Sequence, residues 1–455
     1  MRSYTYYPAR IEKLIIILIL ILLPGITLRF LSYPTIGVIL YIGSIWATIV
    51  LFYPILGLLT MVFLIPLEIL TVLSSSATLI KILGLWTFLA WLLHYKIMLR
   101  EPLRISNVFW LALIFCIWAW ASILWSTNQE ASLSRFINLA LLIGLYFLIT
   151  NLIDSNKRFE LVLGAYILGC FICGLLATKT FLTTGLFSSH SRMSLTGQNP
   201  NTMGVIMALG TMFSWYLFSK TKGSLYRLIV LVLSMFFIYV LIMSQSRGAW
   251  VAFIIASGFY SWPMIKKINF RNILILILLI ACVIIVIVLL SHLFPQMTPF
   301  LQKRFLSIFQ SESLSTRSNI WRVGIEMWKD NPIFGVGLNN FHWVFNKYLD
   351  IPFGLTRYPG AYRDPHNVYL CIICELGLVG FTIFVVMLYS FFTTLRKNEQ
   401  LLKTFMTSIF VLILVVGLKG TIVWSKYYWL VLGLIGASLN FGKQLDQFPI
   451  EDIPV

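Results

Sequence analysis

A histidine stands in the sequence Asp364-Pro365-His366-Asn367, directly before a long apolar segment. Asp is a favoured helix N-cap and Pro is tolerated in the first helical turn, so we expect Asp364 to cap a helix and His366 to lie in its first turn. The positive end of a helix dipole disfavours an imidazolium, whereas a neighbouring carboxylate favours the charged ring or orients it. A neutral imidazole can accept a proton. His366 is therefore a candidate general base, supported by Asp364 and Asn367, and a histidine that only caps or packs is the competing interpretation.

Three arginines bring a second kind of chemistry. Arg247 stands in the short turn Ser244-Gln245-Ser246-Arg247-Gly248, Arg317 precedes Trp321 by one helical turn, and Arg192 lies in another polar turn. A planar guanidinium matches the oxygens of phosphate groups. We therefore predict that Arg247 and Arg317 hold a diphosphate beside the base, with Arg192 as a further contributor and Trp321 in support. An Arg247 that only snorkels from its helix to the interface is the alternative.

Two further ionisable residues lie inside apolar segments. Glu375 follows His366 on the same predicted helix, about 13 Å deeper and on the opposite face. An ionisable group in a bilayer needs a partner or a watery cavity. We expect a structural ion pair between Glu375 and Lys419, and a supporting role of Glu375 in substrate passage is the alternative.

These residues are set in a chain of almost continuous apolar segments. Its 455 residues are 59% hydrophobic and 11% charged, and the mean hydropathy of +0.89 excludes a soluble multidomain protein. Fourteen apolar windows are long enough to cross a bilayer: 14–31, 35–53, 55–73, 77–95, 106–125, 133–153, 159–182, 200–219, 226–243, 247–264, 272–292, 366–395, 404–424 and 426–441. The sequence predicts an all-α fold, a polytopic transmembrane helix bundle of about 12–14 spans with one large extracytoplasmic loop containing short helices.

The basic residues of the short loops fix the orientation, because Lys and Arg resist translocation. With a cytoplasmic N-terminus, the cations of the inner loops are Arg2, Arg10, Lys13, Lys96, Arg100, Arg104, Lys157, Arg158, Lys220, Lys222, Arg227, Lys266, Lys267, Arg271, Arg396, Lys397, Lys403 and Lys443. The predicted organisation is transmembrane helices over 1–292, a large extracytoplasmic loop over 293–365, further transmembrane helices over 366–441 and a cytoplasmic tail over 442–455. This pattern explains the net charge of +18, so no nucleic-acid partner is expected. The first apolar segment is expected to remain as an uncleaved anchor.

Within the large loop, Trp321, Ile325 and Trp328 recur at helical spacing, and Asn331-Pro332 supplies a stop. We expect a short amphipathic helix that lies on the membrane surface or caps a cavity. Arg317 would then lie in its first turn and face the lipid headgroups.

The six cysteines fall inside apolar windows, where Cys acts as a small hydrophobe. No His or Asp lies in register with the two Cys-x-x-Cys pairs. The sequence therefore predicts no metal site and no cofactor.

As a set, the polar motifs resemble the O-antigen ligase and polymerase family. They are Ser-Arg-Gly-Ala-Trp at 246–250, Arg-x-x-x-Trp at 317–321, Asn-Pro-x-Phe-Gly-x-Gly at 331–337 with Phe341, Pro-His-Asn-x-Tyr-Leu at 365–370, and Glu-x-Gly-x-x-Gly at 375–380. The motif-bearing part runs from about Arg192 to Gly380, and the predicted topology fits the remainder.

The resemblance implies glycan transfer from an undecaprenyl-diphosphate carrier to an acceptor hydroxyl, without metal or nucleotide, at the outer face of the bacterial inner membrane. By motif, Arg247 and Arg317 would hold the donor diphosphate and His366 would be the base; direct displacement predicts inversion at the anomeric carbon. Family ligases also use a late acidic residue, and the segment between Glu399 and Asp446 contains none. The acceptor would be lipid A–core or a growing polysaccharide, and membrane lipids are further partners.

Four interpretations compete within these limits. A ligase moves a finished glycan, a polymerase joins repeat units, and the single large loop with its histidine motif favours the ligase. Some relatives are proposed to transport solutes or bicarbonate, but a transporter should show inverted repeats and charge at the bilayer midplane. A purely structural anchor would not need arginines on the outer side.

Overall fold

The computed structural model describes residues 34–74, 77–99, 102–185, 192–265, 312–348, 364–396 and 398–441. Its α-helices are α2 Pro34–Phe52, α3 Pro54–Leu64, α4 Leu79–Trp91, α5 Asn107–Ala121, α6 Gln129–Leu152, α7 Asn156–Thr180, α8 Pro200–Lys220, α9 Ser224–Met243, α10 Arg247–Ile265, α13 Glu312–Asp330, α14 Phe341–Phe345, α15 Val368–Leu395, α16 Gln400–Gly417 and α17 Lys426–Ala437. Short 3-10 and π-helical turns extend them: η1 Ile65–Thr71, η2 Leu92–Met98, η3 Ser122–Trp125, η4 Phe181–Gly185, η6 Asn346–Tyr348, η8 Ile422–Trp424 and η9 Ser438–Asn440.

The apolar windows of the sequence correspond closely to these helices. Each window that falls within the described ranges contains a helix, and eight helical segments there are long and apolar enough to cross a membrane. The all-helical fold of a polytopic membrane protein is therefore confirmed. The windows 14–31 and 272–292 lie outside the described residues.

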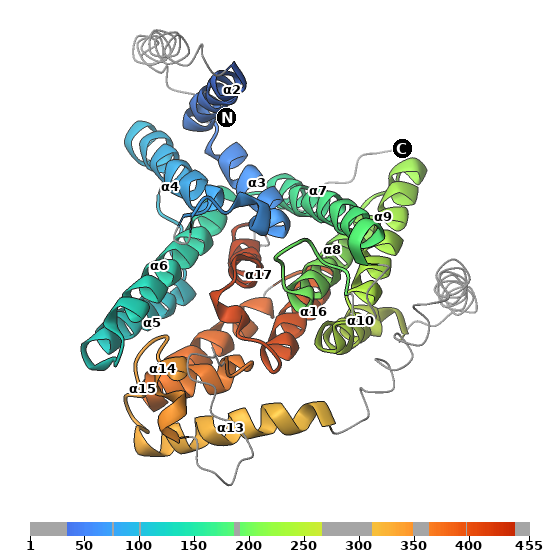
Figure 1. The fold of residues 1–455 in the computed structure, drawn as a ribbon. Helices are drawn as coiled ribbons and strands as arrows, with labels where there is room; N and C mark the ends of the chain where they lie inside the picture. Colours follow the sequence, from blue (N-terminus) through green and yellow to red (C-terminus); the bar gives the residue numbers. More distant parts are fainter. Residues whose placement is uncertain are drawn as a thin grey trace.

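Of the last two windows, the first contains a helix long enough to cross a membrane, α16, whereas the second does not. α16 ends at Gly417 and leaves Lys419 in a turn. α17 has 12 residues, all of them buried, and at about 18 Å it is shorter than the ~30 Å hydrocarbon core of a bilayer. Figure 1 shows α17 in the middle of the molecule, where it contacts α6, α15 and α16. An apolar stretch has the same pattern in a core helix as in a lipid-facing one, so the sequence could not separate the two.

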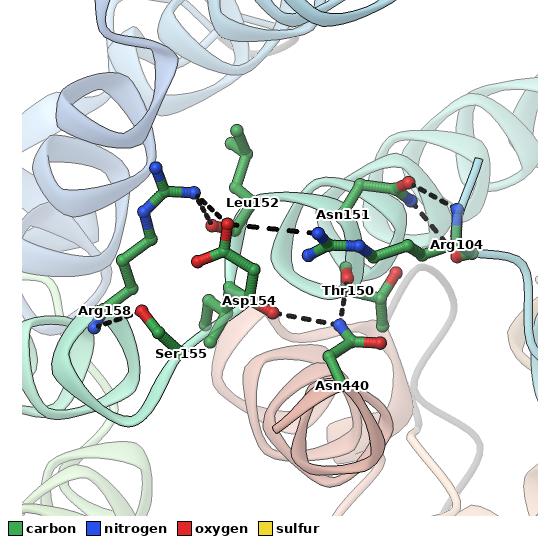
Figure 2. A network of polar contacts seen from close by, with 9 residues as sticks. Arg104, Thr150, Asn151, Leu152, Asp154, Ser155, Arg158 and Asn440 are labelled. Atoms are coloured by element: carbon green, nitrogen blue, oxygen red, sulfur yellow. Dashed lines mark hydrogen bonds and ion pairs between the residues drawn. The ribbon is translucent and has the colours of Figure 1, made fainter. Parts of the chain in front are cut away.

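A network of polar contacts lies at one end of the bundle, where α6 ends (Figure 2). Asp154, which follows α6, accepts a hydrogen bond from Arg158 at 2.7 Å and lies 3.9 Å from Arg104. The side-chain amide of Asn440 donates to the carbonyl oxygen of Thr150 at 2.7 Å. The network joins the segment before α5, the turn between α6 and α7, and the last described turn of the chain, all of which the sequence predicts on the inner side.

α15 is broken in the middle of its apolar stretch. Gly377 has φ of 65° and ψ of −169°, which no helix can contain. The break removes the helical partners of the carbonyl groups of Cys374 and Glu375 and of the N–H groups of Leu378 and Val379. Gly377 lies roughly 14 Å into the helix, where lipid offers no replacement hydrogen bonds.

Residues 331–337, which we call the plug, supply these missing partners. The backbone bonds between plug and helix are Val336 N to Cys374 O, Gly337 N to Glu375 O, Leu378 N to Pro332 O and Val379 N to Ile333 O. Trp118 of α5 adds a bond from its indole N–H to the carbonyl oxygen of Leu376 at 2.9 Å. The Asn-Pro-x-Phe-Gly-x-Gly motif therefore completes the backbone of a broken membrane helix.

An alanine at Gly335 or Gly377 is expected to lower the free energy of unfolding by about 3 kcal/mol or more. The φ angles of these glycines are 71° and 65°. A Cβ would lie 2.5 Å from the carbonyl group of Glu375 in the first case and 2.1 Å from the carbonyl oxygen of Ile333 in the second. Thermal unfolding in detergent measures the effect, with Gly164→Ala in α7 as control because an added Cβ there meets nothing within 4 Å. Equal melting temperatures for all three variants would contradict the role of the plug.

Candidate active site

A pocket of about 700 Å³, the polar pocket, opens at the other end of the bundle. Arg135, in the second turn of α6, lines it, whereas the Figure 2 network surrounds the end of the same helix, about 25 Å further along its axis. The lining comes from stretches that are far apart in the sequence, within 65–72, 192–206, 245–249, 317–342, 364–375 and 416–427, together with Arg135. These stretches include or border loops that the sequence predicts on the outer side, so the structure brings those loops together.

The turn before α10 presents Arg247 to the polar pocket. Ser246 caps the helix, because its Oγ accepts a hydrogen bond from the N–H of Ala249 at 3.4 Å, and Arg247 is the first helical residue. A Cβ on the next residue, Gly248, would lie 3.5 Å from the side chain of Lys419. The Ser-Arg-Gly motif thus caps a helix, presents a guanidinium and leaves room for a second cation.

Lys419, for which the sequence predicts an ion pair with Glu375, is a further cation of the polar pocket. It lines the polar pocket within electrostatic reach of Arg317 and Arg247. Burial, and then the two guanidinium charges, lower the pKa of the Lys419 ammonium below its ordinary value. The predicted ion pair between Glu375 and Lys419 is therefore wrong. Three neighbouring positive charges repel one another, and a bound anion would relieve that repulsion.

Arg192 also lines the polar pocket, but its guanidinium bonds to the protein. Its Nε donates to the carbonyl oxygen of Ser244 at 2.9 Å and its Nη2 donates to Oδ1 of Asn201 at 2.7 Å. These bonds hold the turn that carries Arg247 against the start of α8. Arg192 is placed to position Arg247, and its own contact with a diphosphate stays a prediction.

His366 lies on a turn that is held from both sides. Its φ of 49° is left-handed, and its side chain is 45% exposed. Asp364 accepts the backbone N–H of His366 at 2.7 Å through Oδ1 and the hydroxyl of Thr421 at 2.6 Å through Oδ2. The indole of Trp321 donates to the carbonyl oxygen of Pro365 at 2.9 Å. The turn therefore links α13 to the turn after α16 and leaves the imidazole accessible from the polar pocket.

The helix after this turn begins later than the sequence predicts. Asn367 rather than Asp364 caps α15, because its Oδ1 accepts the N–H groups of Tyr369 and Leu370 at 2.9 and 3.1 Å. His366 precedes the cap, so the expected position in the first helical turn is wrong. Asp364 Oδ1 lies 3.9 Å from His366 Nδ1, which is too long for a hydrogen bond. Asp364 therefore holds the turn through its hydrogen bonds rather than the ring.

α13 is the helix predicted in the large loop, but the residues that it buries differ from the predicted apolar face of Trp321, Ile325 and Trp328. Ile320, Val323 and Met327 are buried, whereas Ile325 is 42% exposed. The helix ends at the predicted Asn-Pro stop but starts earlier, so Arg317 lies in its second turn. Arg317 lines the polar pocket, which corrects the expectation that it faces the headgroups.

Three carboxylates line the polar pocket: Glu68, Asp364 and Glu375. Glu375 is 5% exposed, and its Oε1 accepts the N–H of Phe341 at 3.3 Å. Glu68 forms an ion pair with Lys426 of α17. Sequence reasoning missed Glu68, although an acidic residue inside an apolar window is itself a signal of a site or a partner.

Two more residues of the polar pocket were not predicted. Arg135 donates to Oδ1 of Asn339 at 2.8 and 3.2 Å and lies 5.3 Å from the ring centroid of Trp424. His342 of α14 is a second histidine of the pocket, and burial lowers the pKa of its imidazole, so it is neutral at pH 7. Within the described part of the chain, no group of three or more His, Cys, Asp or Glu side chains is arranged to hold a metal ion.

The fold and the pocket together define a polytopic membrane protein with a cation-rich polar pocket at one end of its bundle. Residues 231–385 match the family model described as O-antigen ligase. This match confirms the resemblance of the motifs to the O-antigen ligase family, and the matched stretch contains Arg247, Arg317 and His366.

Relatives of known description agree with this family. A protein of Rickettsia felis described as a polysaccharide ligase is 26% identical over 362 residues, covering 76% of this chain and 84% of the relative. A second, from Rickettsia conorii, is 22% identical and covers 73% of this chain and 78% of the relative. A ComP-specific O-oligosaccharyltransferase of Acinetobacter baylyi is 28% identical over 158 residues, which are 34% of this chain and 27% of the relative. The family match and these descriptions support a glycosyl-transferring membrane enzyme.

Proposed function

We propose that this enzyme transfers a glycan from an undecaprenyl-diphosphate carrier to an acceptor hydroxyl, with inversion at the anomeric carbon. The reaction would take place at the outer, periplasmic face of the bacterial inner membrane. The enzyme would act as a ligase that delivers a finished glycan to lipid A–core or a related acceptor.

The contacts that place three cations near His366 carry this proposal. Arg317 lies one helical turn before Trp321, which bonds to the turn of His366. On the other side, Thr421 bonds to Asp364 of that turn, and Lys419 stands two residues before Thr421. Lys419 in turn lies beside Arg247 and Arg317. Arg247, Arg317 and Lys419 therefore border the same polar pocket as the accessible imidazole of His366.

These groups fit the charge changes of a direct displacement. The acceptor oxygen forms a bond to the anomeric carbon while the bond from that carbon to the diphosphate oxygen breaks. His366 takes the proton of the acceptor hydroxyl, and the leaving diphosphate keeps the electron pair. Arg247, Arg317 and Lys419 stabilise the negative charge that develops on the diphosphate.

One observation favours a second candidate, a solute transporter. Broken membrane helices are common in transporters, and α15 is broken at Gly377. In transporters, however, the freed backbone groups face a solute, whereas those of α15 bond to the plug. The descriptions of the relatives as a polysaccharide ligase and an oligosaccharyltransferase favour transfer, and the ligase over the polymerase.

Reconstitution in liposomes tests the proposal. The purified protein is given an undecaprenyl-diphosphate-linked oligosaccharide and a lipid A–core acceptor, and the products are separated and their anomeric configuration is measured. Glycosylated acceptor of inverted configuration, with free undecaprenyl diphosphate, supports the ligase. Longer lipid-linked saccharides would indicate the polymerase, and solute uptake without any transfer would indicate the transporter.

Lys419 gives the reaction a pH dependence. Because its pKa is lowered, Lys419 loses its charge at a lower pH than an ordinary lysine, and the KM for the donor should rise as the pH rises into that range. In Lys419→Arg this alkaline rise should disappear, because a guanidinium stays charged. Lys419→Met should raise the KM by about tenfold or more at neutral pH. An alkaline rise in KM that is the same in Lys419→Arg and wild type would contradict the contact with the diphosphate.

A further inference from the structure

A second cavity, the apolar groove, lies between α4 and α6 and has a volume of about 240 Å³. Its walls include Ile80, Leu85 and Phe88 of α4 and Leu141, Leu145 and Leu148 of α6. Leu85 is 58% exposed and Leu141 is 38% exposed, so the groove opens on the outer surface of the bundle. In a membrane-spanning bundle that surface faces hydrocarbon.

The polar end of the apolar groove adjoins the polar pocket. Lys426 lines the groove and pairs with Glu68, which lines the pocket. Asn138 lines the groove and donates to the carbonyl oxygen of Trp424, which also lines the pocket, at 3.3 Å. Two side-chain contacts therefore form the wall between the two cavities.

One face of α6 runs along both cavities. Arg135 lines the polar pocket, and Asn138, Leu141, Leu145 and Leu148 line the apolar groove. Their spacing of three or four residues places them in a row along one side of the helix. This row changes from charged to polar to apolar with distance from the pocket, as a lipid changes from its headgroup to its tail.

We propose that the apolar groove holds the part of the donor's prenyl chain nearest its diphosphate, while the diphosphate lies in the polar pocket. This inference rests on the proposed function. Its support is the shared wall between the cavities and the placement of cations: Lys81 and Lys426 line the groove at the end where an anionic head would lie. Gly144 lines the groove and borders open space, because a Cβ there would meet nothing within 4 Å.

Filling the apolar groove from Gly144 tests the proposal without touching the polar pocket. The purified variants Gly144→Leu and Gly164→Leu are compared, because both glycines are helical and both face open space. Leu exceeds Gly in helix propensity, so both variants should melt at or above the wild-type temperature. Binding is measured in detergent micelles with undecaprenyl diphosphate and with inorganic diphosphate, which share the head but not the chain.

Gly144→Leu is expected to weaken binding of undecaprenyl diphosphate by roughly three- to tenfold, because a displaced chain loses packing contacts but can return to the micelle. Binding of inorganic diphosphate should not change, and Gly164→Leu should bind both probes like wild type. Wild-type affinity of Gly144→Leu for undecaprenyl diphosphate would overturn the groove assignment alone. Loss of a co-purified phospholipid from Gly144→Leu with unchanged donor affinity would assign the groove to a structural lipid instead. If the wild type binds neither probe, the donor of the proposed function fails, and the groove assignment with it.

Discussion

A His366→Asn variant is expected to lose about a hundred- to ten-thousandfold in kcat for glycan transfer, the range of a positioned general base. The substitution removes the proton acceptor at little cost to the fold. The imidazole is 45% exposed, and Asn adopts the left-handed φ of this position more readily than most residues. The melting temperature should therefore match that of wild type, and transfer is measured on the lipid-diphosphate donor at saturating acceptor.

Two further variants decide whether His366 itself is the base. In His366→Gly, added imidazole should restore part of the activity, because the polar pocket is open and large enough to admit a small ring. His342→Asn tests the rival histidine of the same pocket. Full activity of His366→Asn together with loss of transfer in His342→Asn would move the role of base to His342.

Arg317→Lys is expected to lower kcat/KM by about a hundred- to a thousandfold, although the charge is conserved. A guanidinium makes two parallel bonds to a phosphate, whereas an ammonium acts as a point charge on a flexible stem. Arg317 also stands one turn from Trp321, so its position relative to the turn of His366 is fixed by the hydrogen bond to Pro365. The measurement is steady-state transfer with the donor varied.

The control for this variant lies on the same helix. Arg322 is exposed on α13 and does not line the polar pocket. Arg322→Lys should therefore transfer glycan at the wild-type rate. Equal losses in Arg317→Lys and Arg322→Lys would show that the substitutions disturb α13 rather than the diphosphate contact.

The membrane helices could be predicted because their signal is local. A run of apolar residues long enough to cross the bilayer identifies a helix whatever lies around it. The central position of α17 could not be predicted, because burial by protein and burial by lipid select the same residues. The break at Gly377 was also hidden, since the groups that repair it come from residues 331–337, far away in the sequence.

The site was predicted in part for similar reasons. Arg247, Arg317 and His366 were chosen for their chemistry and their loops, and all three line one pocket. Asp364 and Asn367 are both favoured N-cap residues, so the sequence alone does not show which of them caps α15. In the structure the backbone of His366 is left-handed, so the helix begins after it and Asn367 is the cap.

Longer-range partners in the pocket escaped prediction. The ion pair predicted for Lys419 was wrong because contacts between residues far apart in the chain produce no periodic pattern in the sequence. Glu68 and Arg135 did leave a signal, as charges within apolar windows, and that signal could have been used.

The plug has a consequence for the order in which the chain assembles. Residues 331–337 are synthesised before α15, so their N–H and carbonyl groups find partners only after Gly377 and its neighbours have been inserted. The plug and α15 must therefore fold as one unit. The lining of the polar pocket continues to Tyr427, at the start of α17, the last α-helix that the structure describes. During biogenesis, a chain that has not yet reached α17 has membrane anchors but an incomplete pocket, and the site forms only after the start of α17 is in place.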